Sequence, residues 1–260
     1  MRGSSRPIDQ ALRGTPEMTM PAPIQAVTSM SGLFELSPGE IHFLWWFIQG
    51  SIMSPSTRDR LRKAWGLCER HAWGWMIVEA AFRSGYMHGP AVLYEDVMGL
   101  ALAAFDMQGP MQAGRLKRRL RQKRPCLMCE EGFGPHSKGI VKQTIVEQGR
   151  DLTEFRALAR NTLPFWRKAV CGKCAGDGSP ARCRKHLIED ESLGLIGDLS
   201  SARELLTYIA HHLTRYARSF QFEFQGTQTM EDEAALLSAV GWCSGWTLFL
   251  SLVDPPAARV

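Results

Sequence analysis

The feature that most constrains the fold of this chain is a set of four cysteine and histidine pairs, each with a two-residue spacer. A two-residue spacer lets one turn of chain direct both side chains at the same ion, and a tetrahedral metal site takes four such donors. The pairs use six of the seven cysteines, and they are Cys68-x-x-His71, Cys126-x-x-Cys129, Cys171-x-x-Cys174 and Cys183-x-x-His186. Eight donors therefore predict two closed metal sites.

The donor types favour zinc, because thiolate and imidazole groups are its usual structural ligands. An iron–sulfur cluster is the alternative, since thiolates also hold such clusters. Disulfides are disfavoured because the polar, proline-containing stretch Met1–Pro23 does not read as a secretory signal, and intracellular chains keep their thiols reduced. We therefore predict two zinc ions as cofactors and a cytoplasmic location.

The order of the pairs leaves two ways to divide the donors between the sites. Only residues 175–182 separate Cys174 from Cys183, so the last two pairs could form one compact finger. The Cys68 pair would then join the Cys126 pair across residues 72–125 and tie distant parts of the chain together. A crossed pairing, in which the Cys126 pair joins the Cys183 pair, is also compatible with the spacing.

Length and composition indicate an ordinary globular chain. With 260 residues, of which 45% are hydrophobic and 22% charged, it can bury the core of one domain or of two closely packed ones. Helical periodicity runs through most of the sequence, which predicts an all-α fold with two zinc-knuckle or treble-clef-like metal sites. The expected organisation is a disordered or loosely attached segment (1–33), an N-terminal helical region (34–125), a zinc-knuckle region (126–190) and a C-terminal helical pair (191–255).

Several local signals mark where helices begin. The sequence Ser-Pro-Gly-Glu at Ser37–Glu40 predicts a capping box with proline in the first helical turn. Cys68 and Cys183 are each expected at a helix N-terminus, where free amides and the helix dipole favour a thiolate. After the Cys126 pair, Glu130 is expected to open a polar helix that continues past Gly139.

A basic run precedes the Cys126 pair and carries seven cationic side chains in ten residues. A short basic segment beside a metal knuckle could bind phosphates, because neutralising them releases condensed counterions. This predicts nucleic acid, or another polyanion such as an acidic protein, as the partner. The residues are Arg115, Lys117, Arg118, Arg119, Arg121, Lys123 and Arg124.

The alternative is that this basic run is only the solvated face of a helix. Leu116 and Leu120 are four residues apart, so they could dock the helix while the cations point to water. The run contains no aromatic residue, and it therefore lacks the stacking platform typical of proteins that bind single strands. The formal net charge of +5 is too small to decide between the two interpretations.

The segment Ala234–Val253 carries no formal charge and has the length of a membrane span. Its Gly241-x-x-x-Gly245 spacing also resembles a close-packing motif of membrane helices. However, acidic residues 231–233 precede it, and no basic anchor flanks it. We therefore expect a buried C-terminal helix capped at Thr229, with a membrane anchor as the alternative.

The arrangement of these pairs resembles an uncharacterised bacterial family that alternates Cys-x-x-His helix starts with Cys-x-x-Cys knuckles. The resemblance covers about residues 60–210 and implies a helical, metal-holding protein without an implied catalytic activity. This chain departs from the family in lacking a Cys-x-x-Cys before Cys68 and in having the Cys171 pair later. The matching stretches are Gly66-Leu67-Cys68-Glu69-Arg70-His71, Gly89–Tyr94, Cys126-Leu-Met-Cys129 and Cys183-Arg-Lys-His186-Leu187.

Signatures of enzymes are scarce in this sequence. It has no glycine-rich phosphate loop, no nucleophile elbow and no His-Glu-x-x-His helix, and no catalytic residue can be assigned. Two full sets of four donors favour closed sites over a catalytic ion with an open position. The predicted function is a zinc-stabilised helical binding protein. The alternatives are a redox or metal-handling enzyme with a metal cluster, and a membrane-associated component anchored by residues 234–253.

Overall fold

The computed structural model describes residues 34–106, 112–195 and 199–253. Within these ranges the regular secondary structure is helical and no strand occurs, which confirms the all-α class. The predicted N-terminal segment 1–33 lies outside the described residues.

The helices vary from single turns to nineteen residues. They are α1 (Pro38–Phe47), α2 (Pro55–Ala64), α3 (Glu69–Phe82), α4 (His88–Phe105), α5 (Gln112–Leu120), α6 (Leu127–Glu130), α7 (Gln143–Gly149), α8 (Thr153–Asn161), α9 (Leu163–Trp166), α10 (Gly172–Ala175), α11 (Arg184–Ser192), α12 (Ser200–Arg218), α13 (Met230–Ser244) and α14 (Thr247–Val253). Short 3₁₀ turns occur at Ser51–Met53, Arg167–Ala169 and Phe222–Phe224.

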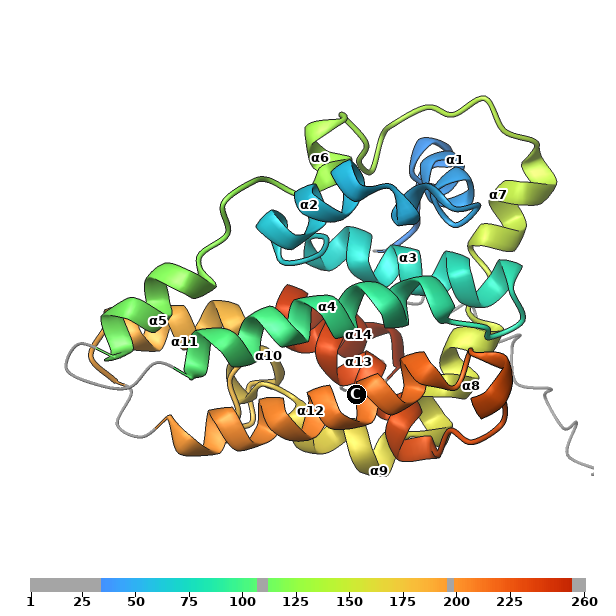
Figure 1. Ribbon diagram of the computed structural model, residues 1–260. Helices are drawn as coiled ribbons and strands as arrows, with labels where there is room; N and C mark the ends of the chain where they lie inside the picture. Colours follow the sequence, from blue (N-terminus) through green and yellow to red (C-terminus); the bar gives the residue numbers. More distant parts are fainter. Residues whose placement is uncertain (1–33, 107–111, 196–198, 254–260) are drawn as a thin grey trace, which may run out of the picture.

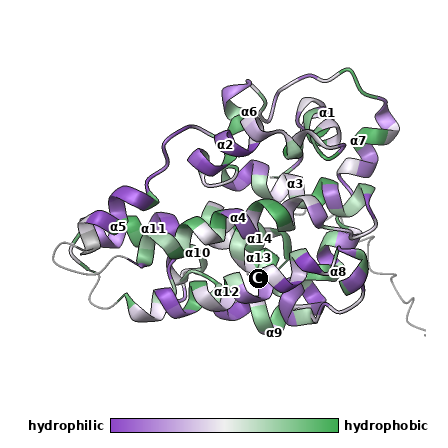
Figure 2. Cartoon of the chain, viewed as in Figure 1, coloured by the Kyte–Doolittle hydropathy of each residue, from purple (hydrophilic) through white to green (hydrophobic). Residues whose placement is uncertain are grey.

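The long helices α4, α12 and α13 pack against one another, with α4 and α13 in the middle of the view and α12 below them (Figure 1). Helix α3 contacts α13 and α4, and α1, α7 and α8 pack against α3. One hydrophobic core runs from Leu36 to Leu252, and five tryptophans are among its largest fully buried side chains. Figure 2 shows hydrophobic residues around α13 and α14, whereas hydrophilic residues cover much of α5.

The predicted capping box at the start of α1 is confirmed. The Ser37 hydroxyl accepts a hydrogen bond from the Glu40 amide at 3.2 Å, and the Glu40 carboxylate accepts one from the Ser37 amide at 2.7 Å. Cys68 and Cys183 directly precede α3 and α11, as predicted. The sequence therefore identifies these helix starts from local signals alone.

The polar helix predicted after Cys129 is wrong. Helix α6 ends at Glu130, and α7 begins only at Gln143. The chain turns at Gly132, whose φ of 82° lies in the left-handed region that favours glycine, and the Phe133 amide donates back to the Met128 carbonyl at 2.9 Å. The acidic pair after the knuckle thus ends a helix instead of opening one.

The C-terminal segment begins as predicted, with a capping box between Thr229 and Asp232. It is not one continuous helix, however, because α13 ends at Ser244 and α14 begins at Thr247. Gly245 adopts a φ of 122° at the break, and its carbonyl accepts a hydrogen bond from Trp73 Nε1 at 2.9 Å. Among the described helices, none combines the length and the apolar content that a membrane crossing requires.

Candidate metal centres

The structure gathers the eight predicted donors into two sets of four, each of which could hold a metal ion. Within each set the ligand atoms all lie within 4.8 Å of one another. This division corresponds to the compact finger considered from the sequence, and the crossed pairing does not form. Group one is Cys68, His71, Cys126 and Cys129, and group two is Cys171, Cys174, Cys183 and His186.

Both groups are built in the same way from two helix starts. In each pair the first cysteine is the N-cap of a helix, and the second donor follows three residues later on the same side of that helix. Free amides at a helix N-terminus stabilise negative charge, so each N-cap position favours a thiolate. The N-caps are Cys68 for α3, Cys126 for α6, Cys171 for α10 and Cys183 for α11.

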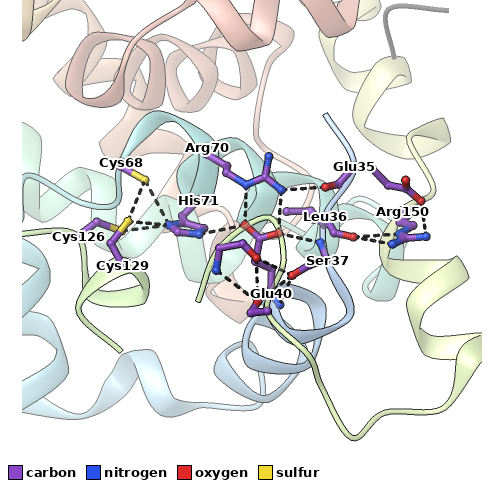
Figure 3. Close-up of polar contacts among 12 residues, drawn as sticks. Glu35, Leu36, Ser37, Glu40, Cys68, Arg70, His71, Cys126, Cys129 and Arg150 are labelled. Carbon is purple, nitrogen blue, oxygen red and sulfur yellow. Dashed lines mark hydrogen bonds and ion pairs between the residues drawn. The ribbon is translucent and has the colours of Figure 1, made fainter. Parts of the chain in front are cut away.

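The spacing in group one fits a single tetrahedral ion. His71 Nδ1 lies 3.2 Å from the sulfur of Cys68, 3.4 Å from that of Cys126 and 3.5 Å from that of Cys129 (Figure 3). The Cys68 and Cys129 sulfurs are 3.8 Å apart. Zinc bond lengths give a tetrahedron with about 3.8 Å between two sulfurs and about 3.6 Å between nitrogen and sulfur.

Group two repeats this geometry. His186 Nδ1 lies 3.2 Å from the sulfur of Cys171 and 3.4 Å from each of the other two, and the Cys174 and Cys183 sulfurs are 3.9 Å apart. The loop that follows the knuckle folds tightly over it, because a Cβ at Gly172 would lie 2.1 Å from the Ser179 carbonyl oxygen. Glycine in the second position of this knuckle is therefore a packing requirement.

Each group contains a cysteine that the other thiols stabilise as a thiolate. Hydrogen bonds from the Cys68 thiol and from His71 lower the pKa of Cys126 to about 3, although burial opposes this. In group two, hydrogen bonds from Cys174 and Cys183 lower the pKa of Cys171. Hydrogen bonding to that thiolate and burial raise the pKa of Cys68 in group one and of Cys183 in group two, so each set holds one readily ionised thiol.

Glu40 supports group one from behind His71. The ring atom Nε2 of His71 lies 3.1 Å from Glu40 Oε1, while Nδ1 faces the three sulfurs (Figure 3). Glu40 is fully buried and accepts hydrogen bonds from Arg70 Nε at 2.6 Å and from the Ser37 amide. Burial favours its neutral form, but hydrogen bonds from Arg70, His71 and Ser37 outweigh it and lower the pKa of Glu40 to about 2.

This contact gives Glu40 a second role, which sequence reasoning missed. A carboxylate on the distal ring nitrogen fixes the tautomer and orientation of a metal-binding histidine. The sequence marks Glu40 only as a helix cap, and no local signal connects it with a histidine in a different helix, farther along the chain.

We predict that Glu40→Gln weakens zinc binding in group one by about 10-fold to 100-fold, because the histidine loses a charged support. The matched control is Glu189→Gln in group two, where the carboxylate lies 3.9 Å from His186 Nε2 and is 53% exposed. Chelator titration followed by native mass spectrometry counts the ions that remain. Equal zinc loss in both variants would show that Glu40 has no special role at the metal.

The segment 243–246, at the end of α13 and in its connection to α14, forms hydrogen bonds beside both groups. On the side of group one, it carries the Gly245 carbonyl that Trp73 binds. On the side of group two, Arg184 Nε in the first residue of α11 donates to the Cys243 carbonyl at 3.1 Å, and the Trp246 amide hydrogen-bonds Cys174. The two groups are therefore attached to the same short segment of the core.

The basic run lies partly on α5, and its apolar residues dock as the alternative interpretation expects. Leu116 and Leu120 are buried, at 3% and 1% exposure. Three cations are held by the protein itself. Lys117 pairs with Glu191 at 3.2 Å, Arg119 Nη1 donates to the Ala103 carbonyl at 2.9 Å, and Arg124 pairs with Glu130.

The remaining cations of the run have no ion pair with any described carboxylate. Arg118, Arg121 and Lys123 are exposed, and Arg115 is half-buried. Docking of α5 and an exposed cationic surface are thus both present, since they use different faces of the same segment.

Comparison with known proteins finds no matching family model, no matching curated protein and no matching solved structure. The resemblance to a bacterial cysteine-rich family stays a prediction.

Proposed function

We propose that this chain is a zinc-stabilised helical binding protein, in which two closed zinc sites hold a basic segment in place for a polyanionic partner. The observation that carries the proposal is that the second half of the basic segment connects the two donor groups. One end of this segment packs on the helix that begins at Cys183, and the other end leads directly into Cys126.

The donor geometry supports zinc over the alternative of an iron–sulfur cluster. Three thiolates and one imidazole at the spacing of a single tetrahedral ion are a common structural zinc set. A cluster distributes its ligands over several irons joined by bridging sulfides, so donors on different irons stand farther apart than the 4.8 Å within which all four donor atoms of each group lie. Four protein ligands also leave no position for a catalytic water, which favours a structural role over a redox or metal-handling enzyme.

Specific hydrogen bonds fasten the second half of the basic segment. At the end of α5, the Leu120 carbonyl accepts from Arg184 Nη1 at 2.9 Å, and Arg184 follows the group-two ligand Cys183. Further along, the Lys123 amide donates to the Lys63 carbonyl at 2.8 Å, close to the start of group one. Since structural zinc binding is also folding free energy, loss of either ion should loosen this segment.

Nucleic acid is the partner class that we propose for the exposed cations. Phosphate backbones bind such surfaces through counterion release, and a rigid cationic segment loses little entropy when it binds. Arg118 and Arg121 are exposed and form no ion pair with a carboxylate in the described ranges, which leaves their charges available to phosphates.

The test combines metal analysis with binding of a labelled single-stranded oligonucleotide. We expect a colourless protein with two zinc ions, and an affinity that falls roughly 100-fold between about 50 and 200 mM salt if about five phosphates are contacted. Arg118→Gln with Arg121→Gln should weaken binding and lower the salt slope by about 1.4. A brown, iron-containing protein would contradict the zinc assignment, and salt-independent or absent binding would contradict the polyanion partner.

A further inference from the structure

An open pocket lined by cations lies beside the basic segment, between α2, α4 and α5. It encloses about 440 Å³, and no acidic residue is among those that line it in the described structure. Four cations line it, Arg62, Lys63, Arg119 and Lys123, together with apolar residues that include Leu100 and Trp65.

Backbone contacts hold the two basic stretches of the lining together. Helix α2 ends where Trp65 adopts a left-handed conformation with a φ of 60°, which turns its indole toward the basic segment. Trp65 Nε1 donates to the Arg121 carbonyl at 3.3 Å, and the Lys123 amide donates to the Lys63 carbonyl at 2.8 Å. The cations of two distant sequence segments are thus positioned before any ligand arrives, which lowers the entropic cost of binding.

The lining carries more positive charge than its neighbours neutralise. Arg62 is fixed by two hydrogen bonds to Asp96, and Lys63 pairs with Asp59 at 2.7 Å. Lys123 has no ion pair within the described residues, and Arg119 donates only to a backbone carbonyl. The Lys63 pair is about half exposed on both sides, so an incoming anion can replace Asp59 at little cost.

The pocket offers two kinds of surface that a nucleotide could contact, one charged and one apolar. The cations that line the pocket suit a phosphate, and guanidinium groups bind its oxygens in a fixed geometry. The lining offers an apolar surface at Leu100, which is 41% exposed, beside the buried Trp65. A sugar and base next to the phosphate could cover that surface, whereas a carboxylate side chain of an acidic protein could not.

We propose that this pocket holds one nucleotide of a single-stranded nucleic acid, with its phosphate on Lys63, Arg119 and Lys123. The inference rests on the proposed function, and it adds residues of α2 that the basic run does not contain. A strand is favoured over a free nucleotide because Arg118 and Arg121, which do not line the pocket, offer further exposed cations on the same segment.

The test compares two matched pairs of substitutions in the zinc-loaded full chain. Lys63→Gln with Lys123→Gln removes two pocket charges, and Lys138→Gln with Lys142→Gln removes two charges outside the pocket lining. With a labelled 20-nucleotide single strand, the pocket pair should weaken binding about tenfold and reduce the salt slope by about 1.4. The control pair should change affinity less than about twofold.

A second readout is protection of lysines from acetylation, measured by mass spectrometry. The oligonucleotide should protect Lys63 and Lys123 and leave Lys138 and Lys142 reactive. If adenosine monophosphate or polyglutamate protects the two pocket lysines while the oligonucleotide does not, assignment of the pocket to a strand is overturned.

The two proposals fail in different ways. If the strand binds, and Arg118→Gln with Arg121→Gln weakens it while the pocket pair behaves like the control, the pocket inference is overturned and the proposed function stands. If the unmodified protein does not bind the strand at any salt concentration, both are overturned.

Discussion

Replacement of Cys126 by serine is expected to leave one zinc ion per chain and to lower the free energy of unfolding by about 4 kcal/mol or more. The serine hydroxyl does not ionise at neutral pH, so group one loses the donor that is most strongly stabilised as an anion. Cys126 is also 4% exposed and caps α6, which leaves little room for a water molecule to replace the thiolate. Elemental analysis and urea denaturation measure the two effects.

The matched control is Cys243→Ser, since this cysteine is similarly buried, at 2% exposure, but belongs to neither group. It should retain both ions and lose much less stability. Hydrogen exchange should localise the damage in Cys126→Ser to α3, α6 and the connection between α13 and α14. Retention of two zinc ions by the Cys126 variant would show that group one is not a closed metal site.

Local features of the sequence predict much of this fold, because helix starts depend on neighbouring residues. Such local features include the capping boxes at Ser37 and Thr229 and the four donor pairs. The division of donors between groups is different, since it depends on which helices pack together. Likewise, contact between Glu40 and His71 exists only because α1 packs on α3.

The break in the C-terminal segment also depends on contacts between helices, which the local sequence does not reveal. Twenty uncharged residues read as one helix, and the glycine at the break is equally consistent with close packing of a continuous helix. The break is stabilised from outside, because Trp73 binds the Gly245 carbonyl and Glu69 Oε1 accepts from the Leu248 amide at 2.8 Å. Both partners belong to α3, far away in sequence, so local propensity could not reveal them.

Gly241→Ala is the second substitution with a large expected effect, and it should destabilise the protein by about 3 kcal/mol. A Cβ at this position would lie 2.2 Å from Cε2 of Trp246, which turns back onto α13. Trp246 is fully buried, and its ring contacts Trp73, Trp166 and Phe249, so it cannot move aside. The collision therefore outweighs the gain of about 1 kcal/mol that alanine brings to a helix.

Replacement of glycine by alanine at another position should instead stabilise the protein. Gly99 lies in α4, and a Cβ added there would meet no atom within 4 Å, so Gly99→Ala should stabilise by about 0.5–1 kcal/mol. Trp246→Leu alone should destabilise by leaving a cavity, but it should also make room for alanine at 241. In a double-mutant cycle measured by urea denaturation, the combined loss should be smaller than the sum of the two single losses. Additive losses would mean that the cost at Gly241 does not come from the Trp246 ring.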